Sequence, residues 1–214
     1  NLTFNAGSYI VVSGTSVNNI GTITNSGPAG YTSISAVIGA NVTGVIQNSA
    51  TSELRLSGVN TFTSGLTIKA GTVQGLTSTS AFGGSGTGAI TIGDTSGSAN
   101  ATLYGNLTST FANPITVATG SSGTLSIQTR YASFSGAITL NNNLTLVDIT
   151  IESTQSITGG ITGTGNVTIN TNDAGAFTLS TTSINNIGTI TNSGSGSGTT
   201  TISAVIGANV TGVI

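Results

Sequence analysis

Two close pairs of charged side chains are the residues of this chain that could do chemistry. Asp148 and Glu152 are four residues apart, so in an extended strand both carboxyl groups would lie on one face. Two carboxylates on one face could supply the acid and the base that cleave a glycosidic bond. Glu53 and Arg55 also share a face of a strand and could form a weak ion pair. Because the chain has no His, no Cys and no Ser-centred nucleophile motif, we interpret Asp148 and Glu152 as two solvated surface acids.

The glycine-rich segments give no better site. Residues 83–88 read GGSGTG, which has the glycines of a calcium-binding β-roll turn but lacks its aspartate, and Asp94 stands alone. Asn172 and Asp173 form a plausible turn, because both side chains can bond to their own backbone. We predict no catalytic, cofactor-binding or metal-ligating residue, no cofactor, and a protein that is not an enzyme.

The composition excludes several classes of function. Charged residues make up 4% of the 214 residues, and the net charge is −2, where globular proteins have roughly a quarter of charged residues. This leaves no positive field to attract nucleic acid, and no stretch is apolar for long enough to span a membrane. The absence of Cys rules out disulfides and thiolate metal sites. Regularly placed Leu, Ile, Val and Phe residues, together with a net charge near zero, predict an ordered chain.

A short unit of apolar residue, Thr, apolar residue recurs along the chain and would position any site. The alternation places aliphatic side chains on one face of a strand and hydroxyls on the other. Because Gly, Asn and Ser separate the units, we predict short strands joined by turns, with helix content near zero. The units are 66–68, 90–92, 115–117, 138–140, 144–146, 149–151, 167–169 and 177–179.

Two segments of the chain occur twice. Residues 18–27 recur unchanged at 185–194, and residues 34–46 recur unchanged at 202–214. The segment between them differs in length by one residue, and residues 2–5 match residues 167–170 in pattern. We therefore predict one full repeat unit over 1–166 and the start of the next over 167–214, within a longer tandem array. We expect the unit to be an axial period of seven or eight coils, about 35 Å long.

A β-solenoid fits these patterns better than the alternative, a tandem array of β-sandwiches. The apolar residues are mostly small or medium in size, with six Phe, four Tyr and no Trp, whereas a sandwich needs large residues between its sheets. Gly and Asn tolerate the positive φ of the corners that a coil must turn. A stack of coils also extends by tandem copying, which a closed sandwich does not.

Residues 54–74 carry a resemblance to a known family. They read LRLSGVNTFTSGLTIKAGTVQ and are similar to the autotransporter-associated β-strand repeat, whose pattern is roughly LTLSG-x-NTYTGGTTI-x-AGTLQ. This chain departs from the pattern at Phe62, Ser64 and Leu66. Residues 81–92 and 113–117 also resemble segments of such passengers, whereas the family's membrane barrel is not among these residues. The matching positions are Ser57-Gly58, Asn60-Thr61, Thr63, Gly65, Thr67-Ile68 and Ala70-Gly71-Thr72.

The resemblance implies a right-handed parallel β-helix that is exported and displayed at the cell surface, as in large adhesins or surface fibres. We accordingly expect an extracellular, non-catalytic shaft. Its expected partners are other copies of itself, end to end or laterally, and surface glycans or other cells, with no nucleic acid and no membrane span.

One alternative is an ice- or surface-binding solenoid that acts through Thr ladders. A less favoured alternative is a β-helix that binds or degrades polysaccharide. The Thr pairs that could form ladders are Thr22/Thr24, Thr61/Thr63, Thr108/Thr110, Thr162/Thr164 and Thr189/Thr191, and their spacing along the chain is irregular.

Overall fold

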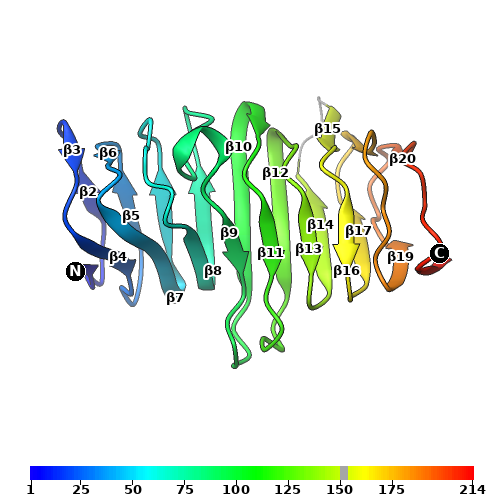
Figure 1. Cartoon of the computed structure of the whole chain (residues 1–214), viewed down its shortest axis with the longest axis horizontal. Coiled ribbons are helices and arrows are strands. Elements are labelled where there is room, and N and C mark those ends of the chain that lie inside the picture. Colours follow the sequence, from blue (N-terminus) through cyan, green and yellow to red (C-terminus); the bar gives the residue numbers. More distant parts are fainter. Residues whose placement is uncertain (150–153) are drawn as a thin grey trace.

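The chain folds into a parallel β-solenoid of about nine turns, as seen in a computed structural model that describes residues 1–149 and 154–214. The coils stack along one axis from the N-terminal end, blue in Figure 1, to the C-terminal end, red in Figure 1. Every strand pairing among the described residues is parallel and joins one coil to the next. The predicted solenoid is therefore confirmed and the alternative of a sandwich array is wrong. The only helical element in this part of the chain is a 3₁₀ turn over Gly84–Gly86.

Each coil contributes strands to three faces, which we call A, B and C in the order in which the chain visits them. Strands β7, β8, β10 and β12 turn a corner and so belong to two faces. Face A consists of β1 (Leu2–Phe4), β4 (Gly21–Asn25), the first parts of β7 (Val42–Leu56) and β8 (Leu66–Gly75), β9 (Ile90–Ile92), β11 (Ile115–Val117), β13 (Ile138–Leu140) and β16 (Ile161–Gly163). Face B consists of β2 (Ile10–Val12), β5 (Tyr31–Ile34), the second parts of β7 and β8, the first parts of β10 (Ala101–Phe111) and β12 (Leu125–Phe134), β14 (Leu144–Asp148), β17 (Val167–Thr171), β19 (Gly188–Asn192) and β21 (Val210–Val213). Face C consists of β3 (Ser16–Val17), β6 (Val37–Ile38), the ends of β10 and β12, β15 (Thr154–Ile157), β18 (Ala176–Leu179) and β20 (Thr200–Ile202).

The apolar residues of the recurring units form the core. In β11, for example, Ile115 and Val117 are buried and Thr116 points outward, as the alternation predicts. A second contribution comes from Phe rings that stack between coils inside face C. The ring of Phe111 lies 4.5 Å from that of Phe82 and 5.5 Å from that of Phe134. The core is thus continuous along the axis.

Asparagine side chains at the corners form hydrogen bonds from one coil to the next. The Oδ1 atom of Asn143 accepts a hydrogen bond of 2.8 Å from the backbone N–H of Asn166, one coil later. The Oδ1 atom of Asn166 in turn accepts a hydrogen bond of 2.9 Å from the backbone N–H of Thr189. An Asn at a corner satisfies a backbone donor that the strand ladder leaves free. The same bond is made by Asn1, Asn18, Asn100 and Asn185.

The two copies of the repeated sequence lie on different faces of the solenoid. Ile23 pairs with Val45 on face A, whereas its copy Ile190 pairs with Val213 on face B. In the same way Ile34 lies on face B and its copy Ile202 on face C. Ile38 lies on face C and its copy Ile206 bridges to Ile184 on face A. The second copy is therefore advanced by seven coils and one face.

This relation differs from the expected axial period, because the advance is not a whole number of coils. Leu2 and Val167 occupy equivalent places in the two copies, since Leu2 pairs with Ile23 and Val167 pairs with its copy Ile190. Leu2 nevertheless lies on face A and Val167 on face B. The strand ladder runs without a break from β14 through β17 to β19. The repeat is thus a screw operation within one continuous stack.

We predict that the corner glycines are essential where coils touch. A Cβ atom on Gly136 would overlap the carbonyl oxygen of Asn113 in the preceding coil, so Gly136→Ala is expected to lower the free energy of unfolding by about 1–3 kcal/mol. At Gly44 the nearest neighbour of such a Cβ is the Cγ2 of Thr22 at 3.7 Å, an ordinary contact. Gly44→Ala is the matched control and should change stability by less than about 0.5 kcal/mol. Urea unfolding followed by circular dichroism measures both, and equal effects would contradict the prediction.

Candidate functional site

Asp148 does not lie where the sequence predicts. It follows Leu144 and Leu146 in the inward-facing positions of β14, and only 1% of it is exposed. The prediction of a solvated surface acid is therefore wrong for Asp148, because the period-two alternation that buries the leucines also buries this carboxyl. Glu152, its predicted neighbour, lies outside the described residues. An inward carboxyl within a packed solenoid cannot reach a polysaccharide on the surface.

Four of the other charged residues form two pairs. Arg55 donates from Nε to Oε2 of Glu53 over 2.7 Å, which confirms the predicted ion pair. Asp94, expected to stand alone, lies 3.4 Å from Nζ of Lys69. The backbone N–H of Thr95 bonds to the Asp94 carboxylate and, with Lys69, holds the pKa of this carboxyl below its usual value. Exposed pairs of this kind contribute little to stability.

No metal site is present in the part of the chain that the structure describes, because nowhere do three His, Cys, Asp or Glu side chains gather. The glycine run at 83–88 contains the 3₁₀ turn Gly84–Gly86. Its backbone is held from the next coil by Asn113, whose Nδ2 donates to the carbonyls of Gly83 and Gly88. Asn172 and Asp173 lie in the connection between β17 and β18.

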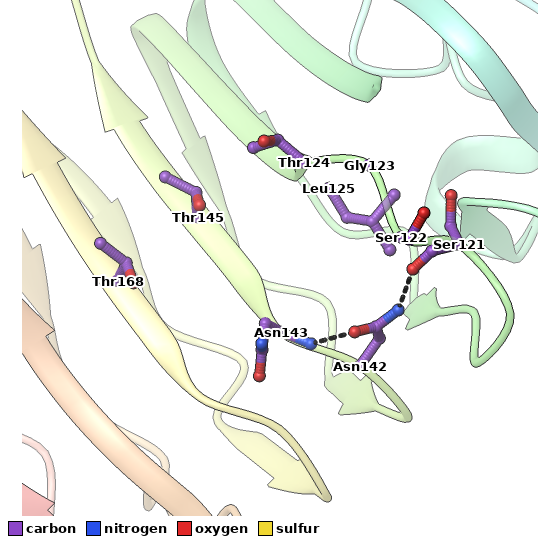
Figure 2. Close-up of a pocket in the computed structure, with 9 residues that line it drawn as sticks. All are labelled: Ser121, Ser122, Gly123, Thr124, Leu125, Asn142, Asn143, Thr145 and Thr168. Atoms are coloured by element: carbon purple, nitrogen blue, oxygen red, sulfur yellow. Dashed lines mark hydrogen bonds between the residues drawn. The ribbon is translucent and has the colours of Figure 1, made fainter. Parts of the chain in front are cut away.

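A hollow of about 440 Å³ lies at the corner between faces A and B (Figure 2). In Figure 2 the side chain of Asn142 reaches toward the turn at Ser121 and Ser122. Its Nδ2 donates to the Ser121 carbonyl over 2.6 Å, and its Oδ1 accepts from the N–H of Asn143. Thr145 and Thr168 complete the wall, and none of the lining residues is charged. The hollow therefore offers hydroxyl and amide groups but neither an acid nor a base.

Threonines form a regular column on face A that the Thr pairs did not reveal. The Thr pairs do not stack on one another, because they lie on different faces: Thr22 and Thr24 are on face A, and Thr189 and Thr191 are on face B. The column on face A is therefore only one residue wide. Neighbouring strands place successive hydroxyls about 4.8 Å apart. Binding to an ice lattice through these residues stays a prediction. The column consists of Thr67, Thr91, Thr116, Thr139 and Thr162 in continuous register.

An aromatic strip extends over the first six coils, along face B and, at its last coil, at the corner with face C. The Tyr9 and Tyr31 rings are 4.6 Å apart, and the Arg55 guanidinium lies 3.9 Å from the centre of the Tyr31 ring. Further along the axis, the Arg130 guanidinium lies over the Tyr131 ring at 5.4 Å and close to the Tyr104 hydroxyl. We define the aromatic strip as Tyr9, Tyr31, Glu53, Arg55, Tyr104, Arg130 and Tyr131.

Sequence reasoning missed this strip because its members are scattered over more than half of the chain. They meet because the coils bring them into register. Ser33 pairs with Arg55, Arg55 with Gln74, and Gln74 with Tyr104. Burial raises the pKa of the Tyr104 hydroxyl, with Arg130 opposing, so this hydroxyl stays protonated at neutral pH and can donate a hydrogen bond.

The C-terminal end of the stack exposes apolar residues that the first copy of the same sequence buries. Ile38 and Val45 are 0% exposed, whereas their copies Ile206 and Val213 are 41% and 56% exposed. In the first copy the next coil covers these residues: Asn60 and Thr61 bond to the backbone of Ile38, and Leu66 of β8 pairs with Val45. The identical residues at 202–214 belong to the last coils that the structure describes. We call the end formed by β20, β21 and Ile206 the open end.

A buried polar network joins the first copy to the coil that follows it. Beneath the first copy, Asn25 donates to Gln47 over 2.8 Å and to Ser52 over 3.1 Å, and it accepts from Thr32. All four residues are buried. In the second copy, the counterpart of Asn25 is the exposed Asn192, and the buried Oγ1 of Thr200, the counterpart of Thr32, has no partner. In the first copy, Gln47 and Ser52 of the following coil make the bonds to Asn25.

Three comparisons set the chain beside known proteins. No protein-family model matches it, and neither does a curated protein or a solved structure. Among the described residues, moreover, no helix has the length and apolar character needed to cross a membrane. The surfaces described above are therefore the basis for any functional proposal.

We predict that the same residue contributes more to stability in the first copy, where the next coil covers it, than in the second copy. Ile38→Ala removes a fully buried side chain and is expected to cost about 2–5 kcal/mol. Ile206→Ala changes the same residue within the same local sequence, where 41% is exposed, and should cost less than about 1 kcal/mol. Denaturant unfolding of the two variants at low protein concentration measures the difference. Equal losses would show that the open end is covered in solution.

Proposed function

We propose that this chain is a segment of the shaft of an extracellular, tandemly repeated surface fibre or adhesin. The observation that carries the proposal is the screw relation between the two copies. The second copy continues the same stack of coils, seven coils and one face after the first copy. Further copies can be added in the same way without interrupting the strand ladder. Each added copy makes the rod longer, as the shaft of a fibre requires.

The surface chemistry supports a mechanical role. Each outward residue lies directly over its equivalent in the next coil, so stacked like charges would repel one another along the whole rod. Threonine columns and asparagine corners avoid this cost, and the Asn side chains bond from coil to coil. The described charged residues on the surface are few, and Glu53, Arg55, Lys69 and Asp94 form pairs.

The resemblance of residues 54–74 to the autotransporter-associated repeat supports the extracellular setting. In this chain the segment runs from the end of β7, across face C, to the end of β8. Asn60, one of the matching positions, is buried and bridges coils: it accepts from the N–H of Ile38 and donates to the carbonyl of Ala81. The matched residues thus serve the stacking that a passenger shaft requires.

Electron cryomicroscopy of the native fibres that carry this sequence tests the proposal. We expect a helical assembly in which each repeat rises about 35 Å along the axis, given about 4.8 Å per coil. Each repeat is also rotated about the axis by about one third of a full turn relative to the repeat before it. Three repeats, or about 105 Å, then bring the same loop back to the same side. Compact particles without a rod would refute the shaft. A rod with a rise of about 35 Å but no rotation would contradict the screw relation alone.

Self-association through the open end is the second part of the proposal. An uncovered β-edge favours pairing with another chain, and a Lys on such an edge blocks it. We expect the 214-residue chain to form end-to-end oligomers as its concentration rises, detected by light scattering after size-exclusion chromatography. Val213→Lys at the open end should abolish them, whereas Val59→Lys, at a residue that is also exposed but lies away from the ends, should not. Oligomers that persist in Val213→Lys would indicate lateral contacts instead.

A further inference from the structure

We propose that the aromatic strip on face B binds a neutral glycan chain laid along the axis of the solenoid. This assigns a binding surface to one half of one face, and it stands apart from the shaft function, which needs no ligand. All four tyrosines of the chain lie in the strip. The later coils of the same face carry Thr145 and Val147, then Thr168 and Asn170, at the equivalent outward positions.

Tyr9 and Tyr131 are the exposed rings of the strip and can serve as stacking surfaces. Tyr9 is 66% exposed and leans against Tyr31 at an interplanar angle of 45°. Arg55 lies over the Tyr31 ring and is itself held by Glu53, so the Tyr31 ring is fixed in place. Exposed aromatic rings in an otherwise Thr- and Ser-rich surface have an apolar face to offer, and the C–H face of a pyranose ring is the group that packs on such a ring. Rigid rings bind at a low entropic cost.

Polar groups lie between the two ends of the strip. A hollow of about 330 Å³ is lined by Glu53, Thr72, Tyr104 and Gln128 on face B and by residues 50–52 at the corner. A carboxylate, an amide and two hydroxyls provide both donors and acceptors, as sugar hydroxyls require. The protonated Tyr104 hydroxyl is one of the donors. Aromatic platforms that flank a polar hollow match a ligand that is apolar on its faces and polar at its edges.

The strip carries too little positive charge to hold a polyanion, which favours a neutral ligand. Glu53 neutralises Arg55 through the 2.7 Å ion pair, and Arg130, which lies over the Tyr131 ring, is the remaining cation of the strip. No cluster of free cations remains in the strip for a phosphate or a uronate polymer. The strip spans six coils, or about 25 Å, and its outward residues follow one another at the strand spacing of about 4.8 Å, with Tyr rings on the first two and the last two of these coils. This repeat is close to the length of one extended β-linked hexose.

The one segment in which the repeated blocks differ carries part of the strip. Residues 28–33, which include Tyr31, are replaced in the second copy by residues 195–201, which contain no aromatic residue. The flanking sequences, 18–27 and 34–46, are unchanged. Between the two unchanged blocks, the variation therefore falls on the segment that carries a surface aromatic residue, as expected where copies of a shaft share a scaffold but differ in ligand.

Intrinsic fluorescence offers a direct test. Because the chain has no Trp and its four Tyr residues all belong to the strip, tyrosine emission reports on this surface alone. The probes are neutral β-1,4-linked hexasaccharides of glucose, mannose and N-acetylglucosamine, with hexagalacturonate as the anionic counterpart. We expect at least one neutral probe to change the emission saturably at millimolar concentration or below, and hexagalacturonate to bind at least tenfold more weakly.

Variants then locate the site by calorimetry. Tyr9→Ala and Tyr131→Ala should each weaken binding about two- to tenfold, as the loss of one stacked ring predicts. Val147→Ala, on the same face beyond the strip, and the exposed Val59→Ala should leave it unchanged. The proposal fails if no neutral probe binds, if only hexagalacturonate binds, or if binding survives Tyr9→Ala/Tyr131→Ala. None of these results affects the fibre images, so the failure of the site and the failure of the shaft are distinguishable.

Discussion

The parallel backbone ladder between successive coils is the interaction on which the rest of this structure depends. Away from the two ends, a strand bonds to the coil before it and to the coil after it, so its side chains have near neighbours of the same orientation about 4.8 Å away. That constraint accounts for the composition. Residues that tolerate a copy of themselves as a neighbour, such as Thr, Asn, Ile and Val, fill the columns. Charged residues are rare because a column of like charges would be repulsive.

Sequence patterns predict the fold well, because the alternation of Ile115, Thr116 and Val117 requires only local information. An apolar–Thr–apolar unit has one buried face whatever its neighbours are, so the strands and the parallel stack follow from period two and tandem recurrence. The same rule, applied to β14, would have placed Asp148 inside with Leu144 and Leu146. The prediction of a surface acid assumed that charge overrides alternation, and in this chain alternation prevails.

The three-dimensional neighbours of a surface residue are harder to predict, because loops change the length of a coil. On face B, Glu53 pairs with Thr72 in the next coil, and Thr72 pairs with Thr102 in the coil after that. The second of these steps covers a much longer stretch of chain than the first, because the glycine-rich run at 83–88 lies within it. A reader of the sequence cannot therefore tell that Arg55 and Tyr104 lie in one column. The aromatic strip and the one-face advance of the repeat both depend on these coil lengths, which tertiary stacking sets.

The advance of the repeat by one face reveals that the three faces are interchangeable. Identical residues form β4 on face A and β19 on face B, and the Ile-Ser-Ala-Val-Ile segment serves the B–C corner in one copy and the C–A corner in the other. A block can occupy any face only if all three faces require the same local structure. This structure consists of a pair of apolar residues that point inward, a small or polar residue that points outward, and a Gly or Asn at the corner. Under that condition a duplicated unit need not contain a whole number of coils. Its variable segment, 28–33 in one copy and 195–201 in the other, then points to a new side of the rod each time, as a fibre that meets its surroundings from every direction requires.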